Sequence, residues 1–456
     1  MTDPVTLRFD GGTLVITGPA ETLDALPHGQ FDPRTGTHRA EGRWYRPVVE
    51  HLRAKQITYQ DDARDYQPIS WTLRDKRPPF PHQHDAVELW WKAGGRGIVV
   101  LPTGTGKTFV AVLAIARAGR PSLVIAPTIV LMNQWYAELR AAFDVEVGLL
   151  GGGTYDLRPL TVATYDSAYR HLERWGNRYG LLVFDECHHL PGASYQLAAV
   201  GAIAPFRLGL TATPERADAG EVVLPDLIGP IVCRREIKQL TGDFLAEYRV
   251  QRVDVELTPE DAERYHQARA IYRQFVETNR ISMSRADGWR HFLILSSRSP
   301  EGRAAFQAYR EQRRLAVAAP AKIHLLGDLL ERHAGDRVIV FSHDNATAYQ
   351  IARKFLVPAI THQTKARERH LILERFHSGE YPIVATSQVL NEGVDVPAAN
   401  VGIILSGTGS VREHVQRLGR LLRKQGDKQA LLYEVVTRGT AEEFTSERRR
   451  QHQAYR

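Results

Sequence analysis

The chain has 456 residues, of which 43% are hydrophobic and 24% charged, a composition typical of globular rather than disordered proteins. This length predicts about three domains. The net charge of +7, from 59 basic and 52 acidic residues, favours a polyanionic partner without requiring one.

The cysteine content and the apolar runs indicate the compartment. Cys187 and Cys233 are too few and too far apart for a disulfide framework or a zinc site, which indicates a reducing environment. The first residues lack the pattern of a secretory signal, and no apolar run approaches the roughly 20 residues that a membrane span needs. We therefore expect a cytoplasmic protein without membrane contact.

The N-terminal residues 1–72 alternate short apolar runs, such as Leu7–Phe9 and Leu14–Ile16, with glycines and prolines. This pattern predicts short strands and turns in a small separate module. A proline-rich break at Lys76–Pro81 follows, and then a helical pattern from Gln83 to Trp91.

The chain then alternates short apolar runs with longer helical patterns. The runs that we interpret as buried strands are Gly97–Leu101, Ser122–Ala126, Leu160–Thr164, Leu181–Phe184 and Arg207–Leu210. The same alternation returns at Arg337–Phe341, Ala359–Thr361, Ile383–Thr386, Val401–Leu405 and Ala430–Val435. Each set predicts a parallel sheet with crossover helices.

Residues 258–314, between the two sets, have helical periodicity, many arginines and seven aromatic residues. Arginine and aromatic residues are adjacent in Arg264–Tyr265 and Trp289–Arg290, which places stacking surface beside phosphate-neutralising charge. A nucleic-acid-contacting insert and a packed set of amphipathic helices both fit this pattern.

A phosphate-binding loop is predicted where the first strand ends, because Gly97–Leu101 leads into a glycine-rich turn and then an apolar helix. Backbone N–H groups of such a turn surround phosphates, and the helix start adds partial positive charge. The predicted nucleotide-binding residues of the turn are Thr103, Gly104, Thr105, Gly106, Lys107 and Thr108. We expect Lys107 to reach the β- and γ-phosphates of ATP and Thr108 to ligate Mg²⁺. A glycine turn with an incidental lysine is the alternative.

Two acidic residues follow the strand Leu181–Phe184, at the sheet edge where open α/β sheets bind ligands. We expect Asp185 to hold Mg²⁺, Glu186 to deprotonate the attacking water, and His188 to sense the nucleotide. The alternative for Cys187, His188 and His189 is packing or a metal cluster, which adjacent residues do not easily form.

Gln416, Arg420 and Arg423 fall on one face of a predicted helix near the end of the chain. An arginine brought to the γ-phosphate stabilises the charge that develops during phosphoryl transfer, so Arg420 and Arg423 are candidate arginine fingers. A solvated basic helix is the alternative.

The order of these motifs resembles that of superfamily 2 helicases, from Arg77 to Arg423. Further motifs that carry the resemblance are Gln83, Ala126–Thr128, Thr211–Thr213, Phe341–Ser342, Ala385–Ser387 and Glu392–Pro397. The resemblance implies that Gln83 recognises adenine and that Gln416, Gly393 and Asp395 lie near the nucleotide. It also implies that Pro127, Thr128, Thr386 and Ser387 lie along the tracking strand, the nucleic-acid strand on which the motor moves. Thr211 and Thr213 are implied to couple ATP hydrolysis to this movement.

Within this superfamily the chain is most similar to the xeroderma pigmentosum group B (XPB) helicases in their compact prokaryotic form. The similarity rests on the Asp185–His189 box, the Thr211–Pro214 run, the N-terminal module, which resembles a damage-recognition domain, and the thumb-like insert. The Arg-Glu-Asp element of the family appears here as Arg216–Asp218, with Ala217 in place of Glu. Arg216 remains a predicted nucleic-acid contact, whereas the acid to which the resemblance assigns a role in strand separation is absent from this chain.

The resemblance implies an α/β fold with two RecA-like parallel-sheet motor domains in tandem, a small N-terminal α+β module and a helical thumb-like insert. The expected domains are 1–72, 73–240, 241–320 for the connector and insert, and 321–456. The expected activity is ATP- and Mg²⁺-dependent 3′-5′ translocation on single-stranded and duplex DNA, with a nuclease as a possible partner. An RNA helicase and an ATP-driven duplex clamp that loads a nuclease without unwinding are the alternatives.

Overall fold

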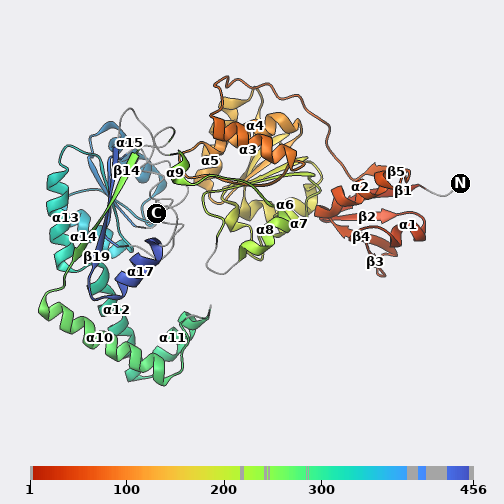
Figure 1. The fold of residues 1–456 in the computed structure, drawn as a ribbon. Helices are drawn as coiled ribbons and strands as arrows, with labels where there is room; N and C mark the ends of the chain where they lie inside the picture. Colours follow the sequence, from red (N-terminus) through yellow and green to blue (C-terminus); the bar gives the residue numbers. More distant parts are fainter. Residues whose placement is uncertain are drawn as a thin grey trace. The chain divides into compact units, whose positions relative to one another are not determined.

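Figure 1 shows a computed structural model of the chain, which describes residues 4–215, 220–240, 244, 247–283, 285, 287–387, 399–406 and 429–450. The chain divides into two compact units, residues 1–235 and 236–456. Each unit contains a largely parallel sheet with helices packed against it, as the alternating sequence pattern predicts (Figure 1). The α/β fold with two motor-type sheets is therefore confirmed.

The N-terminal module is a five-stranded sheet in the order β3-β4-β2-β1-β5. Its strands are β1 (Val5–Asp10), β2 (Thr13–Thr17), β3 (Gln30–Asp32), β4 (Thr37–Glu41) and β5 (Tyr59–Asp62), and its helices are α1 (Ala20–Asp24), η1 (Gly42–Trp44) and α2 (Tyr45–Ala54). Alternate residues of β1 and β2, such as Leu7 and Leu14, meet Val48 and Leu52 of α2 in one core. Ile203, from the following domain, completes this core, so the module is packed against the first motor domain.

The first motor domain contains an eight-stranded sheet in the order β13-β6-β12-β11-β7-β10-β8-β9. The strands are β6 (Arg96–Val100), β7 (Ser122–Ala126), β8 (Val147–Gly151), β9 (Thr154–Asp156), β10 (Leu160–Thr164), β11 (Leu181–Phe184), β12 (Phe206–Thr211) and β13 (Ile231–Arg234). The helices are α3 (Pro81–Lys92), α4 (Lys107–Ala118), α5 (Ile129–Ala142), α6 (Tyr165–Trp175), η2 (Cys187–His189), α7 (Leu197–Val200), η3 (Gly220–Val223) and α8 (Leu224–Leu227). All five predicted strands form, and they are buried because helices cover both faces.

The second unit begins with α9 (Ile237–Leu240) and contains a six-stranded parallel sheet in the order β14-β19-β18-β15-β17-β16. The strands are β14 (Glu247–Val255), β15 (Val338–Phe341), β16 (Ala359–Ile360), β17 (Ile383–Thr386), β18 (Val401–Ile404) and β19 (Gln429–Thr437). The helices of this sheet are α13 (Pro320–Arg332), α14 (Asn345–Phe355), α15 (Ala366–Ser378) and α17 (Ala441–Arg450). The five strands predicted for this half form.

The insert consists of α10 (Pro259–Thr278), α11 (Gly288–Ser296) and α12 (Pro300–Val317) (Figure 1). Phe292 is buried at the centre of an aromatic cluster in which Tyr272, Phe275, Phe306 and Tyr309 are partly buried. Tyr265 is buried in a second cluster with Leu315, and only Trp289 among the seven rings has a large exposed fraction, 39%. Most of the rings therefore hold the three helices together, as in the packed-helix interpretation.

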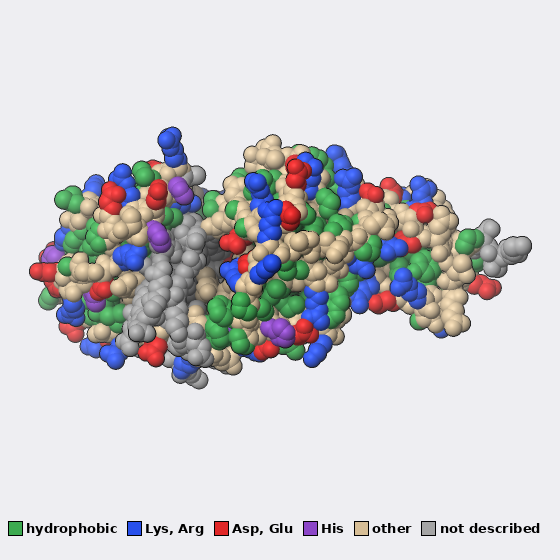
Figure 2. All heavy atoms as spheres, turned by 90° about the horizontal axis from the view of Figure 1, so that it is seen from above, with side chains coloured by type: hydrophobic (Ala, Val, Ile, Leu, Met, Phe, Trp, Pro, Cys, Tyr) green, Lys and Arg blue, Asp and Glu red, His purple; other side chains and the backbone are tan. Residues whose placement is uncertain are grey.

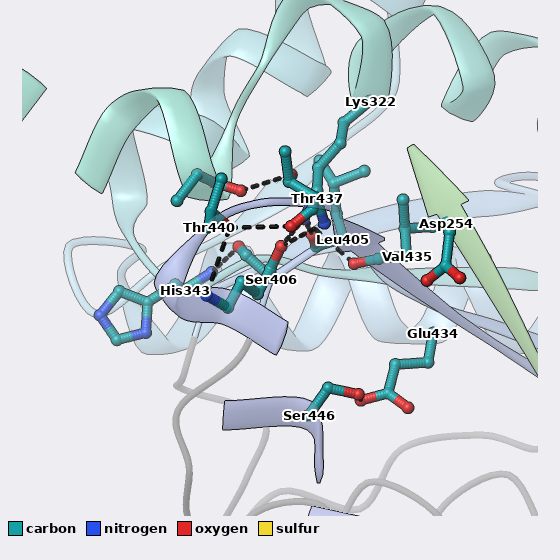
Figure 3. A network of polar contacts seen from close by, with 12 residues as sticks. Asp254, Lys322, His343, Leu405, Ser406, Glu434, Val435, Thr437, Thr440 and Ser446 are labelled. Atoms are coloured by element: carbon teal, nitrogen blue, oxygen red, sulfur yellow. Dashed lines mark hydrogen bonds and ion pairs between the residues drawn. The ribbon is translucent and has the colours of Figure 1, made fainter. Parts of the chain in front are cut away.

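A buried lysine joins four elements of the second unit (Figure 3). Lys322 of α13 donates to the carbonyls of Leu405 and Val435, at 2.7 and 3.0 Å, and to the Glu442 carboxylate of α17 at 2.5 Å. Glu442 also accepts a hydrogen bond from the backbone N–H of Thr437 at 2.8 Å. The network thereby fixes α13 and α17 to the carboxyl ends of β18 and β19.

Candidate nucleotide and nucleic-acid site

Four site segments follow four adjacent strands, β6, β12, β11 and β7, at the carboxyl edge of the first motor sheet. The phosphate loop follows β6, Thr211–Thr213 begins at the last residue of β12, Asp185–Glu186 follows β11, and Pro127–Thr128 follows β7. Parallel pairing brings these segments to one edge although they lie far apart in the sequence.

The phosphate loop has the backbone that close approach to an anion requires. Gly104 and Gly106 have φ angles of 88° and 80°, in the left-handed region that favours glycine. Gly106 is the N-cap of α4, so no side chain caps the first turn of this helix. The Lys107 ammonium donates to the Leu101 carbonyl at 3.1 Å, within the loop.

Gln83 supports the loop from α3. Its buried amide donates to the Thr105 carbonyl at 3.0 Å, and its amide oxygen accepts the Phe80 backbone N–H at 3.0 Å. A Cβ atom on Gly106 would lie 2.3 Å from the Gln83 amide nitrogen, so a larger residue would displace the Gln83 side chain from the loop in addition to straining φ. The structure thus places Gln83 against the phosphate loop.

Asp185 and Glu186 lie where β11 ends. Asp185 is buried, and this burial raises the pKa of its carboxyl group against the opposing effects of a Trp135 hydrogen bond and the Lys107 charge. Glu186 has a φ of 44°, a left-handed conformation that is strained for a residue with a side chain. Such outliers concentrate at functional sites, and this one lies at the residue directly after the proposed metal ligand, Asp185.

His188 connects Glu186 to the segment after β12. Its Nδ1 lies 3.0 Å from the Thr211 hydroxyl and 3.4 Å from a Glu186 carboxylate oxygen. The Thr211 hydroxyl donates to the Thr213 carbonyl and accepts the Thr213 N–H. His188 therefore joins the two motifs, while Cys187 points into the apolar core, where burial raises the pKa of its thiol. Across the described ranges, no group of three or more His, Cys, Asp or Glu residues is arranged to hold a metal ion.

The residues present fit a Mg²⁺–nucleotide. The loop supplies a lysine and the start of a helix that no side chain caps. Beside them, Asp185 supplies a carboxylate oxygen that can act as a metal ligand. The buried Thr103 hydroxyl has no hydrogen-bond partner within the described part of the chain, as expected for a group that a phosphate would satisfy.

The predicted tracking-strand residues have different environments. Thr128 is exposed at the start of α5, where its hydroxyl accepts the Leu131 N–H at 3.2 Å, and Pro127 precedes it. Thr386 and Ser387 are buried after β17, and the Thr386 hydroxyl donates to the Ser387 carbonyl. In this conformation Thr128 alone of these residues offers a freely accessible side chain.

Comparison with known proteins identifies the family. The family model for the XPB damage recognition domain matches residues 7–63, that for the ERCC3/RAD25/XPB C-terminal helicase matches residues 304–455, and that for the res subunit of type III restriction enzymes matches residues 76–216. The DNA 3′-5′ translocase XPB2 of Sulfurisphaera tokodaii is 40% identical over 89% of this chain and 92% of its own. The chain belongs to the XPB helicase family. The DNA 3′-5′ helicase XPB of Mycobacterium tuberculosis is 31% identical over 96% of this chain and 77% of its own.

Solved structures support the fold of this XPB-family chain. The helicase domain of Pyrococcus furiosus Hef has a TM-score of 0.58 at 20% identity, covering 81% of this chain and 98% of its own. Yeast Dbp5 bound to RNA and ADP BeF3 has a TM-score of 0.56 at 14% identity, covering 83% and 89%. At these identities the likeness concerns the fold.

Several predicted residues of the XPB-family motifs lie outside the described residues. They are Arg216, Gly393, Asp395, Gln416, Arg420 and Arg423. Their roles remain predictions from the sequence.

Two residues that the sequence did not single out support the acidic pair of this XPB-family site. The Trp135 indole donates to the Asp185 carboxylate at 2.7 Å, and the Tyr165 hydroxyl donates to the Asp185 carbonyl at 3.0 Å. Both aromatic residues look like core residues in the sequence, and only the fold brings their polar atoms to Asp185.

The described surface bears charges of both signs. Figure 2 shows lysine and arginine side chains scattered among acidic ones on the face drawn, rather than gathered in one basic patch.

The N-terminal module has a groove of about 730 Å³ lined by His28, Phe31, Arg34, Arg39, Arg43 and Trp44, among others. Arg34 and Arg43 form ion pairs with Asp32 and Glu41 in this groove. None of the helices in the described ranges has the length and apolar character needed to cross a membrane.

Proposed function

We propose that the chain is an ATP-dependent DNA 3′-5′ translocase and helicase. The observation that carries the proposal is the convergence of the phosphate loop, Asp185–Glu186 and Thr211–Thr213 on one sheet edge. Similarity over most of the chain to relatives named as DNA 3′-5′ translocase and helicase supports the direction of movement and DNA as the polymer. The domain limits 1–72, 73–240, 241–320 and 321–456 belong to this proposal.

The residues divide the chemistry between them. Lys107 and the loop N–H groups bind the phosphates. Thr108 and Asp185 would hold Mg²⁺, which would neutralise phosphate charge. Glu186 accepts a proton from the attacking water, and His188 and Thr211 hold Glu186 in place. Arg420 and Arg423 are the proposed arginine fingers, which stabilise the charge that develops on the γ-phosphate, and Gln416, Gly393 and Asp395 are proposed to bind the nucleotide. Because His188 contacts both Glu186 and Thr211, ATP hydrolysis is linked to the Thr211–Thr213 segment.

Contact with DNA is assigned to the phosphate backbone. The proposed contact residues are Pro127, Thr128, Thr211, Thr213, Arg216, Thr386 and Ser387. Thr211, Thr213, Thr386 and Ser387 are buried in this conformation, so their contact with a strand requires a rearrangement. Contacts of this kind position a protein on the strand without reading its sequence. A nuclease is the first protein partner to seek, as the family resemblance implies.

A panel of nucleic acids tests the proposal. We expect single-stranded DNA to stimulate ATP hydrolysis more than RNA does, and strand displacement to require a 3′ single-stranded tail. The measurements are steady-state ATPase rates with DNA, RNA and duplex, and displacement of a labelled strand from 3′- and 5′-tailed duplexes at one salt concentration. Stimulation by RNA alone would support the RNA helicase. Duplex stimulation without displacement would support the clamp.

The insert contributes to duplex binding through its charges rather than its rings, since most rings are packed. Arg290 and Arg298 are exposed on and after α11. We expect Arg290→Glu with Arg298→Glu to weaken duplex affinity and to reduce its salt dependence, with basal ATPase unchanged. Duplex binding measured by fluorescence anisotropy over a salt series checks this.

Trp289→Ala provides the matched control for stacking. A loss of duplex affinity in Trp289→Ala alone would reverse the assignment and return the contact to the exposed ring.

A further inference from the structure

Helix α5 links the proposed DNA contact to the metal site. Thr128 is its exposed N-cap, and Trp135 lies two turns further along, about 10 Å at a rise of 1.5 Å per residue. Trp135 is 3% exposed and lies in the core of the first motor domain. One helix thus carries a solvent-facing end and a buried polar group.

The buried polar group is the indole N–H, and its acceptor is a proposed metal ligand. The Trp135 Nε1 atom donates to Oδ2 of Asp185 at 2.7 Å, while Oδ1 accepts the Glu186 backbone N–H at 3.0 Å. The two donors hold both carboxylate oxygens, so the plane of the carboxylate is fixed. Each oxygen keeps a further lone pair for Mg²⁺ or its water shell.

We infer that Trp135 is a positioning residue for the metal site: it fixes the Asp185 carboxylate and makes its orientation depend on the position of α5. The inference rests on the proposed function, because it takes Asp185 as a Mg²⁺ ligand and Thr128 as a DNA contact. Groups that orient a metal ligand affect metal affinity without touching the metal. A shift of α5 on DNA binding at Thr128 moves the indole donor, and Mg²⁺-nucleotide affinity changes with it.

Trp135→Phe tests the inference, because phenylalanine keeps an aromatic ring in the core and removes the donor. The measurement is the binding of fluorescent ADP over a Mg²⁺ titration, with and without single-stranded DNA. We expect the variant to require about tenfold more Mg²⁺ for the same ADP affinity, with Mg²⁺-free affinity unchanged. The effect of DNA on Mg²⁺-ADP affinity should shrink.

Trp90→Phe is the matched control. Trp90 is buried in the same core, and its indole donates to the Arg207 carbonyl at 2.9 Å, so the variant loses an equivalent hydrogen bond away from Asp185. We expect it to lower the unfolding temperature as Trp135→Phe does, with the Mg²⁺ dependence of the wild type.

Three results overturn the inference. An unchanged Mg²⁺ dependence in Trp135→Phe, or the same change in Trp90→Phe, makes Trp135 a packing residue. An unchanged effect of DNA in Trp135→Phe removes the link through α5. Failure of the proposed function is distinct from these three results and is seen in the wild type. Without a Mg²⁺–nucleotide site at Asp185, wild-type protein would show no Mg²⁺-dependent binding of ADP, and without a DNA contact, single-stranded DNA would have no effect on that binding.

Discussion

Glu186→Gln is expected to leave ATP binding intact and to lower DNA-stimulated hydrolysis by about 10²–10⁴-fold, the usual contribution of a general base. The side chain keeps its size and its place after β11, and only its ability to accept a proton is lost. Binding should persist because the phosphate contacts belong to Lys107 and the loop.

The geometry around Glu186 strengthens this expectation. The residue is held in a left-handed conformation, with a φ of 44°, and His188 lies 3.4 Å from its carboxylate. Glutamine keeps the oxygen that faces His188, so the connection to Thr211 is retained. A rate loss in this variant therefore reports proton transfer rather than a displaced motif.

Single-turnover hydrolysis and equilibrium ATP binding, measured on the same preparation, check the prediction. Lys107→Ala is the contrasting variant: it removes a positive charge from the phosphates, so binding should weaken together with the rate. Near-normal turnover in Glu186→Gln would assign the base to another residue.

The motor strands could be predicted from the sequence because helices bury both of their faces. Runs such as Ser122–Ala126, which is apolar after its first residue, and Leu181–Phe184 are buried throughout, and their predicted bounds match β7 and β11. The edge strand β14 was not predicted. Its residues are mostly exposed or partly buried, with only Val255 buried, and it carries charged residues such as Arg249 and Arg252, as an edge strand does.

The site could be predicted only where a short motif carries it. The phosphate loop and Asp185–Glu186 each form one contiguous segment after a strand, so their spacing alone reveals them. The contacts of Trp135, Tyr165 and Gln83 depend on neighbours 20 to 50 residues away in the sequence. Contacts of this kind arise from the sheet order, which the sequence pattern does not specify.

Lys322→Met is expected to destabilise the second unit by about 3–5 kcal/mol, the usual cost of removing one partner of a buried ion pair. Methionine fills much of the space of the lysine stem but leaves the Glu442 carboxylate buried without its ammonium group. The Leu405 and Val435 carbonyls also lose their donor. The loss of stability should affect β18, β19 and α17 together, because the ammonium group joins them.

Hydrogen exchange measured on peptides from β19 and α17 checks the prediction locally, which suits a chain of two units better than one global unfolding curve. Lys354→Met is the control: Lys354 is exposed on α14, and its replacement should change stability by about 0.5 kcal/mol or less. Equal rates of hydrogen exchange in the two variants would mean that the buried network contributes little to the stability of the second unit.

The double variant Lys322→Met with Glu442→Gln separates charge from packing. It removes both charges at once, and the glutamine oxygen can still accept the Thr437 N–H. Because an uncompensated buried charge causes most of the single-variant cost, the double variant should be more stable than Lys322→Met alone. A double variant as unstable as the sum of both single variants would show instead that the lysine acts through its carbonyl hydrogen bonds, with no coupling to Glu442.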